Sequence, residues 1–318
     1  MSISFQALFQ SAEQQRAKRN PIMPQIPSPR AAAVIAALAT AVPAAGEARA
    51  TGSEPVAEFS TEFENQQVLT DWSEHNVSGW APKWQPPRIE NGHLVLQPRS
   101  SGWFDDNHAG HLYRTVTGDF IVSTRVKAEG TQSTYPKTDF SLAGLFIRAP
   151  RDLPAALSWT PGKENWLFFS VGTAEPAGEP HYEIKSTINS RSVLKILQAQ
   201  EGWVELRIAR TGELFTLLHR PEGVHDWTVL DQMIRPDLPE TLNVGLTAYS
   251  DWTSIARSPN YNVDGTVEQH ADFIARVDYI RFRRPASSDR LPIANLDAPQ
   301  AGPLGPMIKA RRDDLLSN

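Results

Sequence analysis

Short segments in which apolar and polar residues alternate, separated by turn residues, run along most of the chain from residue 59 onward. In the most regular one, a period of two puts Val204, Leu206 and Ile208 on one face and Glu205 and Arg207 on the other. Such segments, rich in Val, Ile, Phe, Thr or Tyr, are predicted as strands over 93–97, 112–116, 120–128, 141–148, 166–171, 182–188, 193–197, 203–209, 215–219, 242–249 and 273–283. Sustained helical periodicity and βαβ spacing are both missing there. The pattern therefore predicts an all-β fold, an antiparallel two-sheet β-sandwich of the jelly-roll type.

The first 50 residues have the composition of a leader rather than of a folded domain. An Ala-rich apolar run over 31–45 follows Arg30, and Ala48-Arg49-Ala50 places small residues where a signal peptidase reads them. We therefore expect an N-terminal extension and signal peptide over 1–50, cleaved after Ala50, and a periplasmic or extracellular protein. Met23 offers an alternative start, because residues 1–22 are polar, and an Ala-rich linker is the alternative to a leader.

The rest of the chain divides into a spacer over 51–57, a β-sandwich domain over 58–285 and a flexible Pro-rich tail over 286–318. The chain has no cysteine, which excludes disulfides and zinc–thiolate sites. Its formal charge of −5 argues against a nucleic-acid partner. No second long apolar segment follows the leader, so we expect no transmembrane segment in the mature protein.

Several phrases, taken in order, carry a family resemblance. They are L-Y-R-T-V-T-G-D-F over 112–120, A-G-L-F-I-R over 143–148, W-V-E-L-R-I-A-R-T-G over 203–212 and H-D-W over 225–227. Together they resemble the concanavalin A-like lectin/glucanase superfamily, closest to domain-of-unknown-function family 1349 and to laminin-G-like bacterial secreted modules, over about 59–284. The resemblance implies a jelly roll and a carbohydrate-binding, lectin-like protein that holds a glycan on its concave sheet face. Alternatives are a hydrolase with a non-standard acid/base pair and a structural or protein-binding module like laminin-G.

Catalysis remains open in the sequence. Glucanases of this superfamily carry the motif E-x-D-x-x-E on one strand, which gathers their carboxylates on one face, and the motif is absent here. The remaining acid/base candidates are Asp106, His108 and Glu183.

Two regions hold the candidate ligand-binding residues. The loop over 102–111 concentrates aromatic, carboxylate and imidazole groups, and alternation over 182–189 puts Glu183 and Lys185 on one polar face with Thr187 and Asn189. The full set of candidates is Trp103, Asp105, Asp106, His108, His111, Arg148, Trp166, Glu183, Lys185 and Arg191. Trp80 and Trp84 lie in a Pro-rich stretch and are expected to be exposed at one end of the groove. The alternatives are a polar turn and an ordinary solvated sheet face.

A structural calcium ion is a further expectation. Glu62 or Glu64, near the first strand, could meet Asp278 on the last strand if the two ends of the domain pair, and Ca²⁺ prefers such oxygen ligands. Isolated surface carboxylates are the alternative. His108 and His111 are three residues apart, but zinc would need further ligands.

Overall fold

The computed structural model describes residues 56–75, 77–151, 160–258, 262 and 270–285. The predicted leader (1–50), most of the spacer and the tail (286–318) lie outside the described residues. Within the described residues, no helix is long and apolar enough to cross a membrane.

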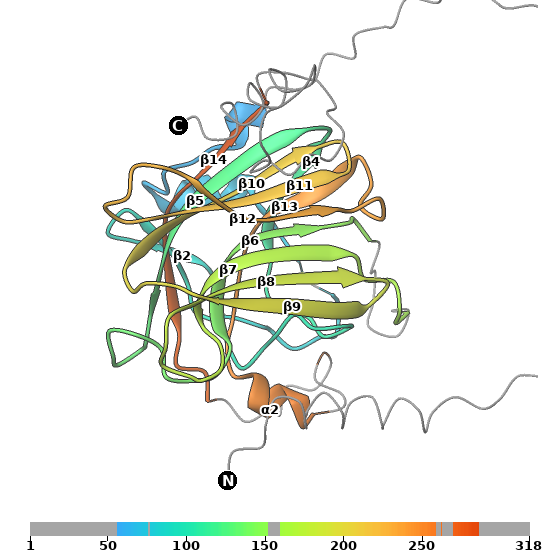
Figure 1. Cartoon of the computed structure of the whole chain (residues 1–318). Coiled ribbons are helices and arrows are strands. Elements are labelled where there is room, and N and C mark those ends of the chain that lie inside the picture. Colours follow the sequence, from blue (N-terminus) through green and yellow to red (C-terminus); the bar gives the residue numbers. More distant parts are fainter. Residues whose placement is uncertain (1–55, 76, 152–159, 259–261, 263–269, 286–318) are drawn as a thin grey trace, which may run out of the picture. The chain divides into compact units, whose positions relative to one another are not determined.

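Two antiparallel seven-stranded sheets make up the domain (Figure 1), as predicted. Sheet I contains, in spatial order, β1 (Ser73–Glu74), β4 (Leu112–Thr117), β13 (Thr241–Tyr249), β6 (Ser141–Arg148), β7 (Trp166–Thr173), β8 (His181–Ile188) and β9 (Arg191–Gln198). Sheet II contains β12 (Thr228–Ile234), β11 (Leu214–Pro221), β10 (Trp203–Thr211), β5 (Phe120–Glu129), β14 (Ile274–Arg283), β3 (His93–Leu96) and β2 (Arg88–Glu90). Short helices are η1 (Val56–Phe59), η2 (Gln66–Asp71) and α2 (Trp252–Ala256).

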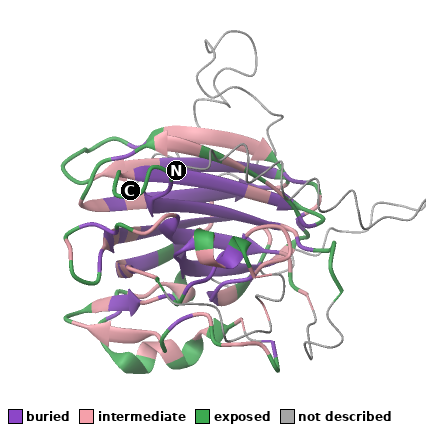
Figure 2. Cartoon of the chain, turned by 90° about the horizontal axis from the view of Figure 1, so that it is seen from below, coloured by how far each residue is buried: buried purple, intermediate pink, exposed green. Residues whose placement is uncertain are grey.

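Alternation along the strands builds the core between the sheets. In β10, the predicted inward residues Val204, Leu206 and Ile208 all belong to the buried apolar cluster. In β6, the cluster takes Ala143, Leu145 and Ile147. Most strand positions in both layers are buried (Figure 2).

Eleven predicted strands are present, with bounds that differ by at most two residues at either end. Gly118 and Gly212 have φ of 81° and 60°, where a Cβ would be strained. The strands β1, β2 and β12 were missed, because two are very short and β12 lies at a sheet edge with weak alternation.

The first described residues join the last strand. Val56, assigned to the spacer by the sequence, is buried in the core, and Thr61 pairs with Ile280 of β14. The two ends of the domain therefore meet, as the calcium hypothesis required.

Two of the carboxylates proposed as calcium ligands, Glu62 and Asp278, form ion pairs with arginines. Glu62 forms a bidentate pair with Arg281 at 2.7 and 2.8 Å, and Asp278 accepts from Arg125 at 2.9 Å. No group of three or more His, Cys, Asp or Glu among the described residues could hold a metal ion. Calcium near Glu62, Glu64 and Asp278 therefore stays a prediction without a site.

Candidate functional site

A segment of residues 100–110, called here the covering segment, runs over the face of sheet I that points away from the core. Its anchor is Trp103, whose ring stacks on Phe146 of β6 at 4.5 Å between centroids. The indole N–H of Trp103 donates to Thr247 Oγ1 of β13 at 3.0 Å. Trp103 is completely buried, so the face that the sequence predicted as an open glycan groove is covered.

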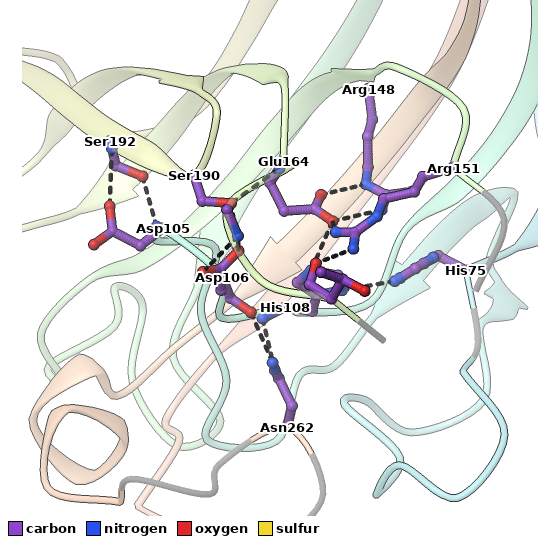
Figure 3. Close-up of polar contacts among 12 residues, drawn as sticks. His75, Asp105, Asp106, His108, Arg148, Arg151, Glu164, Ser190, Ser192 and Asn262 are labelled. Carbon is purple, nitrogen blue, oxygen red and sulfur yellow. Dashed lines mark hydrogen bonds and ion pairs between the residues drawn. The ribbon is translucent and has the colours of Figure 1, made fainter. Parts of the chain in front are cut away.

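Two aspartates hold the turn of the covering segment. Asp105, at a φ of 50°, accepts from the backbone N–H of Ser192 at the start of β9, at 2.9 Å. Asp106 accepts from the backbone N–H of Gly162 at 3.0 Å and from the hydroxyl of Ser190. Both carboxylates, predicted as ligand-binding groups, thus fix the loop to sheet I (Figure 3).

Beneath the covering segment, β8 and β13 carry a buried polar triad. Glu183 and Lys185 do share one face, as predicted, but both are buried rather than solvated. The hydroxyl of Tyr249 donates to Glu183 Oε1 at 2.6 Å and accepts from Lys185 Nζ at 2.6 Å, and Lys185 also donates to the Trp103 carbonyl. Burial lowers the pKa of Lys185 and raises the pKa of Tyr249 well above its ordinary value. This triad therefore belongs to the packing of the covered face and does not line an open groove.

A second polar cluster links the covering segment to the ends of β6 and β7 (Figure 3). Glu164, two residues before β7, accepts from Arg148 Nε at 2.9 Å and from Arg151 at 2.6 Å. His108 Nε2 lies 3.4 Å from Glu164 Oε1, and His108 Nδ1 lies 2.9 Å from His75 Nε2. These contacts form a continuous row of charged and polar side chains, which runs from two arginines through one carboxylate to two imidazoles.

Burial decides the charge states in this cluster. It lowers the pKa of His75 and His111 well below the ordinary 6.5, and Arg148 adds to both shifts. The pKa of His108 is also lowered by burial, although Glu164 opposes that shift. Burial alone would raise the pKa of Glu164, but His108 and Arg148 hold it well below its usual range. At neutral pH the cluster therefore contains an ionised carboxylate and neutral imidazoles.

The last imidazole of this cluster, His75, lines a pocket of about 120 Å³ at the edge of the covered face. Its lining includes Glu74, His75, Trp80, Lys83, Trp84 and His108. The Trp80 ring packs edge-on against His108, with centroids 4.8 Å apart. Burial lowers the pKa of Lys83 to about 7.

The tryptophan predictions were half right. Trp80 is partly exposed, as expected, but Trp84 is buried, and its indole N–H donates to Glu74 Oε1 at 2.6 Å.

The predicted site residues fall into three groups. Trp103, His108, His111, Arg148, Trp166, Glu183 and Lys185 are buried together beneath or within the cover; Asp105 and Asp106 fix its turn; and Arg191 is exposed at the first position of β9. Of this set, only His108 lines the pocket.

Sequence reasoning missed His75, Lys83 and Glu164. Glu164 left a usable signal: it lies two residues before a predicted strand whose first residue, Trp166, pairs with Arg148. Pairing the two neighbouring strands as a hairpin would have brought the carboxylate to the arginine. His75 left no such signal, because it precedes an irregular stretch.

No protein-family model matches the sequence, and no curated protein matches it at a significant level. Among solved structures, the chain is similar to a functionally unknown protein from Saccharomyces cerevisiae, with 14% identity, a TM-score of 0.46, and 69% of this chain and 99% of the other covered. A GH43 protein from Bacillus licheniformis shows 14% identity and a TM-score of 0.46, with 71% of this chain covered but only 39% of that one. Lectin I-B4 from Griffonia simplicifolia shows 15% identity and a TM-score of 0.42, with 70% and 98% covered. Because all three TM-scores are below 0.5, these likenesses carry no argument, and the function has to be argued from the side chains.

Proposed function

We propose that the protein binds carbohydrate and that the pocket beside Trp80 receives a sugar unit. One observation carries the proposal: an aromatic wall and several hydrogen-bonding groups converge on one small pocket. A sugar ring offers a face of C–H groups to an aromatic ring and hydroxyls around its edge. Trp80 supplies the aromatic face, and Glu74, His75 and Lys83 supply acceptors and a donor.

This location differs from the concave face expected from the sequence. Glu183 and Lys185 are buried under the covering segment and engaged with Tyr249, so they are not available to a glycan. The pocket lies where the cover meets β1 and leaves polar groups accessible.

The pocket favours binding over hydrolysis. Glycoside hydrolysis uses two carboxyl groups that flank the scissile bond. Of the acid/base candidates, Glu183 is buried and Asp106 is bound to Gly162 and Ser190, and neither lines the pocket. Glu74 is the one carboxylate among the lining residues that the structure describes.

A glycan array with purified protein tests the proposal, with Trp80→Ala as the test variant and Trp203→Ala as its control. Trp203 is a partly exposed tryptophan on sheet II, stacked on Arg125. We expect Trp80→Ala to weaken binding of the recognised glycans by about tenfold, since one stacking face contributes on the order of 1.4 kcal/mol. Trp203→Ala should bind as the wild type does.

Three outcomes would contradict this reading. If Trp80→Ala binds glycans as tightly as the wild type does, the sugar binds at another surface. An empty array would favour the structural or protein-binding alternative. Release of reducing sugar from an array-positive polysaccharide, if it persists in the purest fractions, would favour the hydrolase.

We also propose that the protein acts outside the cytoplasm, on the strength of the leader-like residues 1–50. N-terminal sequencing of protein expressed from the full chain in a bacterial host should find Thr51 as the first residue. An intact N-terminus in the cytoplasmic fraction would contradict export.

A further inference from the structure

We propose that Glu164, His108 and His75 form a relay, made of an electrostatic contact between Glu164 and His108 and a hydrogen bond between His108 and His75, that holds His75 as a neutral acceptor at the pocket wall. His75 is then the residue that selects ligands with a hydroxyl donor at that point, which means neutral sugars rather than sugar acids. The inference rests on the proposed function and narrows its ligand class.

The relay follows from the chemistry of its first member. His108 Nε2 lies 3.4 Å from Glu164 Oε1, a contact without good hydrogen-bond geometry. A lone pair on Nε2 would face the ionised carboxylate and be repelled by it, whereas an N–H there is attracted, so Nε2 carries the proton of His108. A neutral imidazole carries one N–H, which leaves His108 Nδ1 as an acceptor. His75 Nε2, 2.9 Å from that acceptor, is therefore the donor. The lone pair of His75 is left on Nδ1.

Nothing in the described part of the chain uses that lone pair. His75 Nε2 is bound to His108, and the backbone N–H of His75 donates to the His111 carbonyl at 2.8 Å. Among the residues that the structure describes, His75 Nδ1 makes no hydrogen bond. Since His75 lines the pocket, a ligand hydroxyl is a suitable partner.

The surrounding charges make His75 an acceptor rather than a base. The groups that face the two imidazoles are Glu164, Arg148, Arg151 and His111, with Glu74 and Lys83 on the pocket side. Both arginines form ion pairs with Glu164, and their positive charges offset the attraction of its carboxylate for a proton on His75 or His108. A proton added to His75 would be poorly hydrated and would lie near the positive charge of Arg148, so the ring stays neutral near pH 7.

A neutral acceptor discriminates between ligand types. A hydroxyl group can donate to the Nδ1 lone pair, whereas a ligand carboxylate placed there would bring two acceptors together with no proton between them. Glu74 beside it adds negative charge to the same wall. Sugar acids are therefore disfavoured at this position.

Nitrogen NMR on the full chain, labelled at its eight histidines, tests the relay without any sugar. His75→Gln assigns the His75 signals, and His225→Ala, at an exposed histidine, is the control. We expect His75 and His108 each to carry the proton on Nε2 and to stay neutral as the pH falls through 6.5. A proton on Nδ1 of His75, or titration of His75 near its ordinary pKa, would overturn the relay.

Binding tests the selectivity. Methyl glycosides of glucose, galactose and mannose, their monodeoxy derivatives and the matching uronic acids are titrated against the wild type and His75→Phe. We expect one deoxy position and the uronic acid to bind about three- to tenfold more weakly than the parent to the wild type, the effect of one hydrogen bond, and this difference to vanish in His75→Phe. If the difference persists in His75→Phe, His75 is not the selecting residue. If the NMR result holds but no sugar perturbs the His75 signals, the proposed function fails and the relay stands.

Discussion

Replacing Trp103 by Ala should remove the anchor of the covering segment. The side chain is completely buried, stacks on Phe146 and on His108 at 4.5 and 4.7 Å, and donates one hydrogen bond to Thr247. Truncating a buried tryptophan costs about 3–5 kcal/mol, and the value rises when the cavity cannot collapse. Here both neighbouring rings are held, one by its strand and the other by the histidine–glutamate chain, so we expect about 4–5 kcal/mol.

Urea unfolding followed by far-UV circular dichroism measures this cost, since tryptophan fluorescence itself changes with the substitution. Trp103→Phe, which keeps an aromatic ring but loses the hydrogen bond and some volume, should cost about 1–2 kcal/mol. Trp203→Ala, at a partly exposed position, should cost about 1 kcal/mol. A loss below about 2 kcal/mol for Trp103→Ala would refute the reasoning, because it would mean that the cover contributes little to the folded state.

Three further variants are expected to change stability in the same assay. His111→Phe should make the folded state less sensitive to acid. The folded pKa of His111 lies well below 6.5, so below pH 6.5 the unfolded chain binds a proton that the folded chain does not, and each such histidine costs up to about 1.4 kcal/mol of stability per pH unit. Equal pH slopes of the free energy of unfolding in the variant and the wild type would contradict this. Glu164→Ala should cost about 3–5 kcal/mol at pH 7, because it leaves the buried Arg148 without its carboxylate; a cost under about 1 kcal/mol would show that the pair is solvated. Gly144→Ala should cost about 3 kcal/mol, since a Cβ would collide with the carbonyl oxygen of Phe169 on the neighbouring strand; wild-type stability would show that the strands can part at that point.

The layered fold was predictable because alternation is a local signal. The inward residues Val204, Leu206 and Ile208 could be read from five consecutive positions, and the core cluster contains all three. Short strands such as β1 and β2 have too few residues to show any period, so they escaped prediction.

The site was only partly predictable, since its geometry depends on chain crossing rather than on periodicity. Alternation correctly put Glu183 and Lys185 on one face, but it could not tell that residues 100–110 cover that face. The loop composition pointed to Trp103 and His108, while their burial and the partnership of His108 with His75 arise from contacts 33 residues apart in sequence. For the same reason, a loop rich in polar groups was interpreted as a ligand surface when most of its groups hold the loop in place.

A crystal structure of the protein with a glycan selected on the array is the decisive experiment. We expect a sugar ring stacked on Trp80, with one hydroxyl within hydrogen-bond distance of His75 Nδ1 and the Trp103 cover closed. A sugar bound instead against Glu183 and Lys185, with the cover displaced, would contradict it.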